Sequence, residues 1–283
     1  MPDFPLRRCL HRPGHKFKIN HCAEEAPRTK TADLPCARTF FPTPLMLKSD
    51  LHLHSSEDPR DPLDYDARDL IREAGRLGFD VIAITLHGKV IDDSGLEDFA
   101  REQGVLLIRG IEKCIHGKEV LIYNVTQEES DAVRTFSDLR ELRQRKGAGI
   151  LTIAPHPFFR GSQCLGRHLE ENIGLFDAIE FCHLYTRFLN LNRRAVEVAA
   201  RHGKPMVATS DAHALWMFGR NYTWLDAPRT IEGVFQAVRA GRVQPHSAPI
   251  TPLELGKKLG WLCAVVEARR LARRWRGKTM PSF

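Results

Sequence analysis

Two histidines two residues apart, in Asp50-Leu51-His52-Leu53-His54, are the side chains best placed to do chemistry in this sequence. Side chains two apart on an extended strand point to the same face, so both imidazoles can reach one point near the end of that strand. Imidazole nitrogens are common ligands of zinc and other transition metals. A His-x-His pair is a weak signal alone, so its meaning depends on the rest of the chain.

Further metal-binding side chains follow short apolar runs in the same chain order. They are His87, Glu112, His156, Asp211 and His213. Each apolar run is typical of a buried strand, and the carboxyl-terminal ends of the strands in an α/β barrel meet on one face. This pattern predicts a metal centre on that face. Mixed nitrogen and oxygen ligands favour Mn²⁺, Zn²⁺ or Fe²⁺ over Mg²⁺ or Ca²⁺ alone.

This order of motifs resembles the PHP (polymerase and histidinol phosphatase) family of metal-dependent phosphoesterases. The resemblance covers roughly residues 46–246 and is carried by Asp50-Leu51-His52-Leu53-His54, Gly110-Ile111-Glu112, Ala154-Pro155-His156-Pro157 and Ser210-Asp211-Ala212-His213. It implies an α/β fold, a distorted seven-stranded TIM-like barrel of the PHP type. It also implies two or three divalent metal ions (Mn²⁺, Zn²⁺ or Fe²⁺) as cofactors.

The resemblance adds ligands that lie outside the strand-end pattern. The family places an Asp or His shortly after His-x-His, and here Asp58 is the preferred candidate, with Asp61 as the alternative. The family also places a His at the start of the strand after Glu112. Glu119 aligns best with that position, and His116 is the alternative. We therefore predict two metal ions and leave a third open.

One family feature is missing next to His87. An acidic residue usually precedes this histidine in the family, but here the position is Leu86. The carboxylate that would orient the His87 ring is therefore not identified from the sequence. Glu180, which ends a short apolar run, resembles a family acid near the metals.

Two metal ions about 3.5–4 Å apart can hold a hydroxide nucleophile and both oxygens of an in-line displacement. Phosphate esters need such help, because the anionic phosphoryl group repels a nucleophile. We expect a metal-bridging hydroxide to attack phosphorus directly, with His87 or a metal-bound water protonating the leaving group. Cys114 and Cys182 lie near strand ends, but no Cys-Arg phosphatase loop accompanies either of them.

Cations for the phosphoryl oxygens are expected from residues that follow strand ends: Lys89, Arg160 or Arg187. His183 is a further candidate on the same rim. The expected substrate is a small phosphorylated molecule, for example a nucleotide or histidinol phosphate, or the end of an oligonucleotide.

Seven short apolar runs predict the strands that must position these residues. We expect strands at 47–53, 80–85, 105–111, 119–125, 150–154, 175–181 and 205–209. Helices are expected at 65–77, 96–103, 130–146 and 189–202, each followed by a glycine that favours a helix end. Helices that alternate with buried strands favour an α/β barrel.

The two ends of the chain differ from its middle. Residues 1–45 lack a periodic apolar face, and we expect a disordered N-terminal extension before the barrel at 46–250. Residues 251–283 predict a basic amphipathic helix, whose segment 257–276 is a candidate contact for an anionic membrane surface or a nucleic acid. Because all predicted ligands lie within 46–252, we expect that part alone to retain hydrolysis.

Charge follows the same division. Of the formal net charge of +7 over 283 residues, residues 1–47 carry +4 and residues 253–283 carry +6, which leaves −3 for the middle. An acidic middle suits a cation site better than a broad nucleic-acid surface. We expect a cytoplasmic protein, because we find no long apolar run, no apolar signal region near Met1, and no C-x-x-C pair among seven cysteines.

Two other functions remain open from the sequence. A barrel that begins with His-x-His and ends with an Asp also suits C–N hydrolysis of the amidohydrolase type. Those barrels commonly carry a bridging Lys on a middle strand, and we find none so placed here. A non-catalytic metal-binding or nucleic-acid-binding protein, acting through the basic end, is the second alternative.

Overall fold

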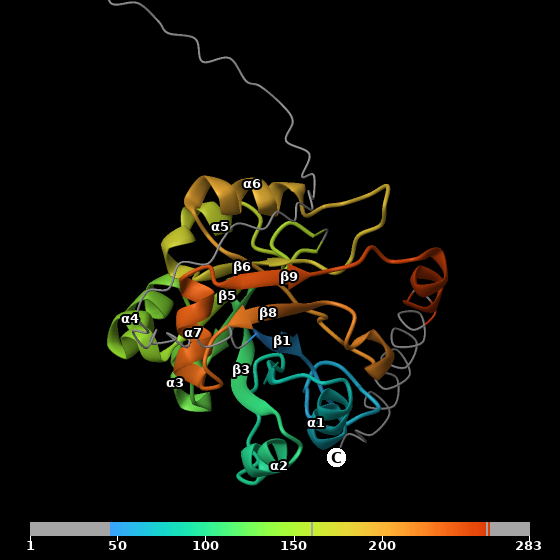
Figure 1. The fold of residues 1–283 in the computed structure, drawn as a ribbon. Coiled ribbons are helices and arrows are strands. Elements are labelled where there is room, and N and C mark those ends of the chain that lie inside the picture. Colours follow the sequence, from blue (N-terminus) through green and yellow to red (C-terminus); the bar gives the residue numbers. More distant parts are fainter. Residues whose placement is uncertain (1–45, 160, 259, 261–283) are drawn as a thin grey trace, which may run out of the picture. The chain divides into compact units, whose positions relative to one another are not determined.

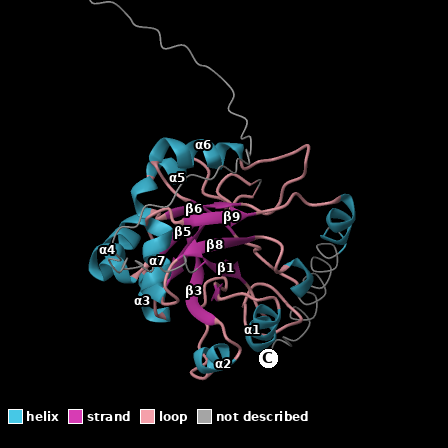
Figure 2. Ribbon diagram, in the orientation of Figure 1, coloured by secondary structure: helices cyan, strands magenta, loops and turns pink. Residues whose placement is uncertain are grey.

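The computed structural model describes residues 46–159, 161–258 and 260, all within the unit Pro42–Phe283. Strands gather in the middle of this unit and helices lie around them (Figures 1 and 2). The strands are β1 (Met46–Leu53), β2 (Val81–Ile84), β3 (Leu106–Ile115), β4 (Lys118–Tyr123), β5 (Leu151–Ala154), β6 (Ala178–Phe181), β7 (Met206–Ala208), β8 (Tyr222–Asp226) and β9 (Val243–His246). The predicted disordered extension at 1–45 lies outside the described residues.

The helices are α1 (Ala67–Arg76), α2 (Leu96–Glu102), α3 (Gln127–Ala132), α4 (Phe136–Lys146), α5 (His168–Glu171), α6 (Arg193–His202) and α7 (Ile231–Arg239). Short 3-10 turns occur at η1 (Gly147–Gly149), η2 (Ile173–Leu175) and η3 (Leu215–Met217). Residues 252–258 are also helical, and most of the predicted basic helix after them lies outside the described residues. Within the described ranges, no helix is long and apolar enough to cross a membrane.

The helix predicted at 130–146 is instead two helices, α3 and α4. A capping box at Thr135 starts α4: the Thr135 side chain accepts from the Asp138 backbone, and the Asp138 carboxylate accepts from the Thr135 backbone. These reciprocal bonds satisfy amide groups that a helix start leaves unpaired. The helices predicted at 65–77, 96–103 and 189–202 are confirmed as α1, α2 and α6, with small shifts at their ends.

The sheet has more strands than the predicted seven. All seven predicted strands are present as β1 to β7, but the described sheet contains nine, in the order β7-β6-β5-β4-β3-β2-β1-β8-β9. Strand β8 pairs antiparallel with β1, and β9 pairs antiparallel with β8. Strand β8 alternates buried and half-exposed residues and β9 is largely exposed, so neither forms the continuous apolar run of a buried strand.

Strand β4 runs antiparallel to both of its neighbours, unlike β2 between β1 and β3. It forms a hairpin with β3 in which Ile115 pairs with Lys118. The two turn residues, His116 and Gly117, have φ of 51° and 75°. A two-residue hairpin turn of this kind requires positive φ at both positions. The hairpin places Glu119, at the start of β4, close to the end of β3.

Side-chain hydrogen bonds join β7, at one end of the strand order, to β8 and β1 near the other end, so the sheet forms a nearly closed barrel. The hydroxyl of Thr223 in β8 bonds both the backbone N and the backbone O of Ala208 in β7, each at 2.8 Å. The Asp50 carboxylate of β1 accepts from the Ser210 backbone N at 3.2 Å. Burial raises the pKa of Asp50 to about 7. The first residue of the Asp-x-His-x-His motif thus ties β1 to the segment after β7.

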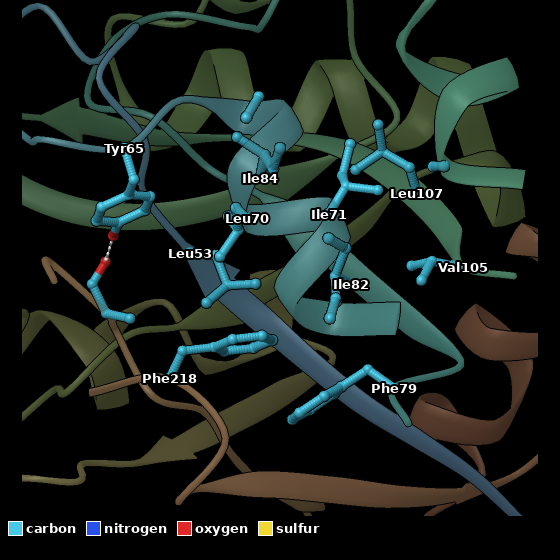
Figure 3. Close-up of a cluster of buried hydrophobic side chains, with 14 of the residues drawn as sticks. Leu53, Tyr65, Leu70, Ile71, Phe79, Ile82, Ile84, Val105, Leu107 and Phe218 are labelled. Atoms are coloured by element: carbon cyan, nitrogen blue, oxygen red, sulfur yellow. Dashed lines mark hydrogen bonds between the residues drawn. The ribbon is translucent and has the colours of Figure 1, made fainter. Parts of the chain in front are cut away.

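An apolar cluster between α1, β1 and β2 holds the last motif in place (Figure 3). Leu70 and Ile71 of α1 are fully buried against Leu53 and Ile82 of the strands. The hydroxyl of Tyr65 in this cluster donates to the carbonyl of Ala212 at 2.9 Å, the dashed bond in Figure 3. Ala212 lies between Asp211 and His213, so packing around α1 positions both of these side chains.

Candidate metal centre

Four side chains from β1, β3 and the segment after β7 converge on one point. The Nε2 atoms of His52 and His54 each lie 3.5 Å from Oε2 of Glu112. The same nitrogens lie 3.5 and 3.4 Å from Oδ1 of Asp211. Four ligands about 2.1 Å from one ion in tetrahedral geometry would lie about 3.4 Å apart. This set therefore has the spacing of a metal site.

A second set of ligand atoms lies beside the first and shares Glu112. The Nε2 of His87 lies 3.0 Å from Oε2 of Glu112, and the Nε2 of His156 lies 3.4 Å from Oε1. The carboxylate of Glu119 is 4.0 Å from the His87 nitrogen and 3.9 Å from the His156 nitrogen. Oε2 of Glu112 thus faces His52, His54 and His87, and its Oε1 faces His156, so this carboxylate could act as a ligand in either set.

Unpaired polar atoms test whether these residues fit metal ions. The Nε2 atoms of His52 and His54 and the Oε1 of Glu112 are buried and have no hydrogen-bond partner among the described residues. Buried polar atoms in proteins nearly always have a partner, and leaving one without a partner costs about 1–3 kcal/mol. All three atoms belong to ligand types that bind Mn²⁺, Zn²⁺ or Fe²⁺. The residues therefore fit metal ions.

Carboxylates on the far side of the rings orient the histidines. The Nδ1 atoms of His54 and His87 each lie 3.0 Å from Oδ2 of Asp58. The Nδ1 of His52 lies 3.0 Å from Oε1 of Glu180. An Nδ1–H donated to a carboxylate leaves the Nε2 lone pair for a metal. Asp58 thus supplies the orienting carboxylate that Leu86 does not provide for His87.

The two acids considered after His-x-His have different surroundings. Asp58 also accepts from the backbone N of His87 at 2.8 Å, and its other oxygen accepts from the backbone N of Arg60 at 2.8 Å. Asp61 lines the cavity in front of the metal ligands, and its Oδ2 lies 3.1 Å from the Nε2 of His213. The contacts therefore give Asp58 an orienting position and Asp61 the one that faces the cavity.

Acidic residues dominate the electrostatics of the site. Burial opposes ionisation of Glu112, but His52 and other neighbouring imidazoles outweigh it and hold the Glu112 pKa well below its usual range. Burial likewise opposes ionisation of Asp211, but His52, His213 and His54 lower its pKa well below the ordinary value. Ionised carboxylates in a buried place favour cations.

Two of the site residues have strained backbones. His156 has φ of 27° and Asp211 has φ of 45°, in a region that residues with a side chain rarely adopt. His156 also precedes Pro157, which normally favours an extended conformation. Such strain costs about 1–3 kcal/mol and is typical of functional sites. At His156, the Glu180 carboxylate holds the strained backbone by accepting from its N at 2.6 Å.

A cavity of about 480 Å³ opens in front of the ligands. Its apolar side is lined by Phe159, Leu184, Met217 and Leu255. Two cations that the sequence analysis did not select, Arg60 and Lys258, also line it, together with His183. Arg60 is in the loop that carries Asp58 and donates to Glu119 at 2.7 Å. No motif marks Lys258, which lies more than 200 residues beyond the His-x-His pair.

The cations predicted at the rim are placed differently. Lys89 does not line the cavity, and its ammonium donates to the carbonyl of Glu57 at 3.2 Å. Arg187 is exposed and also lies outside the cavity lining. Arg160 lies outside the described residues. Among the alternatives, His116 is exposed in the β3–β4 turn, whereas Glu119 lines the cavity.

Comparison with known proteins agrees with this fold. A family model described as PHP-associated matches residues 190–243. The structure is similar to that of a two-domain protein from Bacteroides vulgatus, containing a predicted PHP-like metal-dependent phosphoesterase, with a TM-score of 0.55 and 21% identity. That likeness covers 71% of this chain and 65% of the other, so the chain spans about two thirds of that relative's length.

A second similar structure is that of PsfC from Pseudomonas syringae, with a TM-score of 0.53 and 18% identity. This likeness covers 76% of the chain and 97% of PsfC. A search of curated proteins found no match. The resemblance to the PHP family that the motifs predicted is confirmed by the family model and the shared fold. The predicted barrel is confirmed as a mixed α/β barrel-like sheet, although its strand number was wrong.

Proposed function

We propose that this chain, which shares its motif order and fold with PHP-like proteins, is a metal-dependent phosphoesterase that hydrolyses a small phosphomonoester. The observation that carries the proposal is the position of Glu112, whose carboxylate lies 3.0–3.5 Å from the Nε2 atoms of four histidines that belong to both ligand sets. A carboxylate shared by two ligand sets is the arrangement that two-metal hydrolysis requires.

The candidate ligands form two sets, each of which could bind one ion. His52, His54 and Asp211 lie close enough together to hold one ion, and Glu112 with His87 and Glu119 could hold another, with His156 3.4 Å from Oε1 of Glu112. Bound divalent ions would supply a nucleophile at neutral pH and neutralise charge on the phosphoryl oxygens. Asp61 and His213, which approach each other at 3.1 Å at the cavity wall, are candidates for a third site.

The protein's own contribution is orientation. Asp58 and Glu180 hold three imidazoles with their Nε2 atoms toward one another, so the ligands are positioned before any ion or substrate binds. His87 keeps its Nδ1 on Asp58 and presents Nε2 to Glu112, which favours a ligand role over proton donation. Leaving-group protonation would then come from water in the cavity.

The cavity supports a small substrate. Its volume of about 480 Å³ falls within the usual range for small-molecule sites, and part of its lining is apolar. In a phosphomonoester with a compact organic group, such as a nucleotide or histidinol phosphate, the phosphate suits the metal ligands and the organic group suits the apolar lining. The amidohydrolase alternative is less well supported, because Glu112 takes the bridging place that a Lys commonly has in those barrels.

Metal removal tests the proposal. We expect the full-length protein to hydrolyse at least one member of a phosphomonoester panel, to lose that activity on chelation, and to recover it with added Mn²⁺. A panel of carboxamides and cyclic amides should remain uncleaved. Hydrolysis unaffected by chelation, or cleavage of amides in place of phosphoesters, would contradict the proposal.

A further inference from the structure

The helix at 252–258 lies against the cavity that holds the candidate metal ligands. Leu255 and Lys258 of this helix line the cavity together with Asp211 and His213. The helix follows the barrel strands in sequence and is drawn at the red end of the colour scale in Figure 1. The segment predicted as a basic amphipathic helix therefore begins in the wall of the cavity.

Several contacts hold this segment on the barrel. The backbone N of Ile250 donates to the carbonyl of Tyr185 at 2.8 Å, and Arg220 donates to the carbonyl of Pro249 at 2.7 Å. Arg220 also forms an ion pair with Glu254. The helix start is capped, because Glu254 accepts from the backbone N of Thr251 at 2.8 Å. These contacts give Lys258 a defined place.

The Lys258 ammonium lies among the cavity residues and donates to the Nε2 of His183, a buried imidazole. Burial and the neighbouring Lys258 lower the pKa of His183, so this imidazole is neutral and can accept the bond. Among the ion pairs between described residues, none joins Lys258 to a carboxylate. An ammonium has three donors, so two of them remain for a ligand in the cavity.

The cation keeps its charge near neutral pH. Burial lowers the pKa of Lys258 to about 8, and the nearby Asp211 carboxylate opposes that lowering. Lys258 is half-buried, and a cation partly removed from water is stabilised when an anion lies beside it. The anion that fits this place faces both the ammonium and the metal ligands, which is the position of a phosphoryl group.

We propose that Lys258 is a substrate-binding residue whose ammonium binds a non-bridging phosphoryl oxygen across the cavity from the metal ligands. This inference rests on the proposed phosphoesterase function and names the residue that binds its substrate. The C-terminal helix then belongs to the active site, and the chain needs more than residues 46–252 to bind substrate well. Lys89 and Arg187, selected from the sequence for this role, lie outside the cavity lining.

Binding of inorganic phosphate and steady-state kinetics of the full-length, Mn²⁺-loaded protein test the inference. We expect Lys258→Met to raise both the Kd of phosphate and the KM of the best phosphomonoester about tenfold or more. Metal content should stay at the wild-type value, and Lys258→Arg should keep much of the affinity. Lys257→Met is the matched control, since Lys257 is exposed on the same helix and should behave as wild type.

The outcomes separate this inference from the proposed function. Hydrolysis by the wild type, with unchanged Kd and KM in Lys258→Met, would overturn the role of Lys258 and leave the phosphoesterase standing. Phosphate binding that depends on Lys258 without hydrolysis of any phosphomonoester would overturn the phosphoesterase alone. A loaded wild type that neither binds phosphate nor hydrolyses phosphomonoesters would overturn both.

Discussion

The cavity has two walls that differ in how they are built. The metal wall comes from the ends of β1 to β7, and its His52 and His54 are buried with carboxylates behind them. The opposite wall, which we call the cap wall, comes from His183, Leu184 and the helix at 252–258. Leu255 of the cap wall is 38% exposed, whereas His52 and His54 are fully buried. The first histidine pair is therefore enclosed by the barrel, whereas the helix of the cap wall is held by a few contacts near the surface.

This difference separates two kinds of effect. Changes in the metal wall should alter metal content and kcat, because they disturb the ligands themselves. Changes in the cap wall should alter KM at constant metal content, because they disturb only the group that meets the substrate.

Loss of a ligand should have the largest effect. We expect His54→Ala to lower kcat by about 10³-fold or more, since it removes a nitrogen that faces both Glu112 and Asp211. Metal content should fall in parallel. His116→Asn is a suitable control, because His116 lies exposed in a turn with positive φ that Asn tolerates. Near-wild-type turnover by metal-depleted His54→Ala would contradict the assignment of this wall.

Loss of an orienting carboxylate should have an intermediate effect. Asp58→Asn removes the negative charge behind His54 and His87 and leaves one oxygen where two now accept bonds, so we expect a loss of about 10–100-fold in metal affinity or kcat/KM. Asp64→Asn, an exposed acid in the same loop, is the matched control and should match the wild type. Steady-state kinetics and metal titration of both variants measure kcat/KM and metal affinity for this comparison. A loss as large as that of His54→Ala would instead indicate that Asp58 is a direct ligand.

Loosening of the cap wall should have the smallest effect. Glu254→Ala removes both the helix cap at Thr251 and the ion pair with Arg220, and we expect KM to rise about two- to fivefold with metal content unchanged. Glu232→Ala, at the start of α7 and outside the cavity lining, should leave KM as it is. A fall in metal content in Glu254→Ala would show that the two walls are not independent.

The metal wall could largely be predicted from the sequence, whereas the cap wall could not. His52, His87, Glu112, His156 and Asp211 each belong to a short motif at the end of an apolar run, so local pattern and motif order were enough to select them. Their convergence follows from strand ends that meet on one face. The number of strands was wrong because β8 and β9 are partly exposed and lack an apolar run.

Features that depend on the direction or packing of distant segments were not predictable. Glu119 was selected through the family resemblance, but no local pattern indicates the antiparallel direction of β4 that brings it to the site. The role of Asp58 depends on which nitrogens face it in space. Lys258 belongs to a basic segment whose lysines and arginines look alike in sequence, and only contacts with His183 and Tyr185 place it at the cavity.

The number of bound metal ions decides whether the strand ends form a site for two ions. Elemental analysis of full-length protein after gentle purification should find at least two equivalents of Mn, Zn or Fe per chain, because Glu112 faces two ligand sets at once. When apo protein is titrated with Mn²⁺, it should bind at least two equivalents per chain. Phosphomonoester hydrolysis should recover over the same range of added Mn²⁺. Less than one equivalent, with no binding and no recovered activity on adding Mn²⁺, would contradict the account.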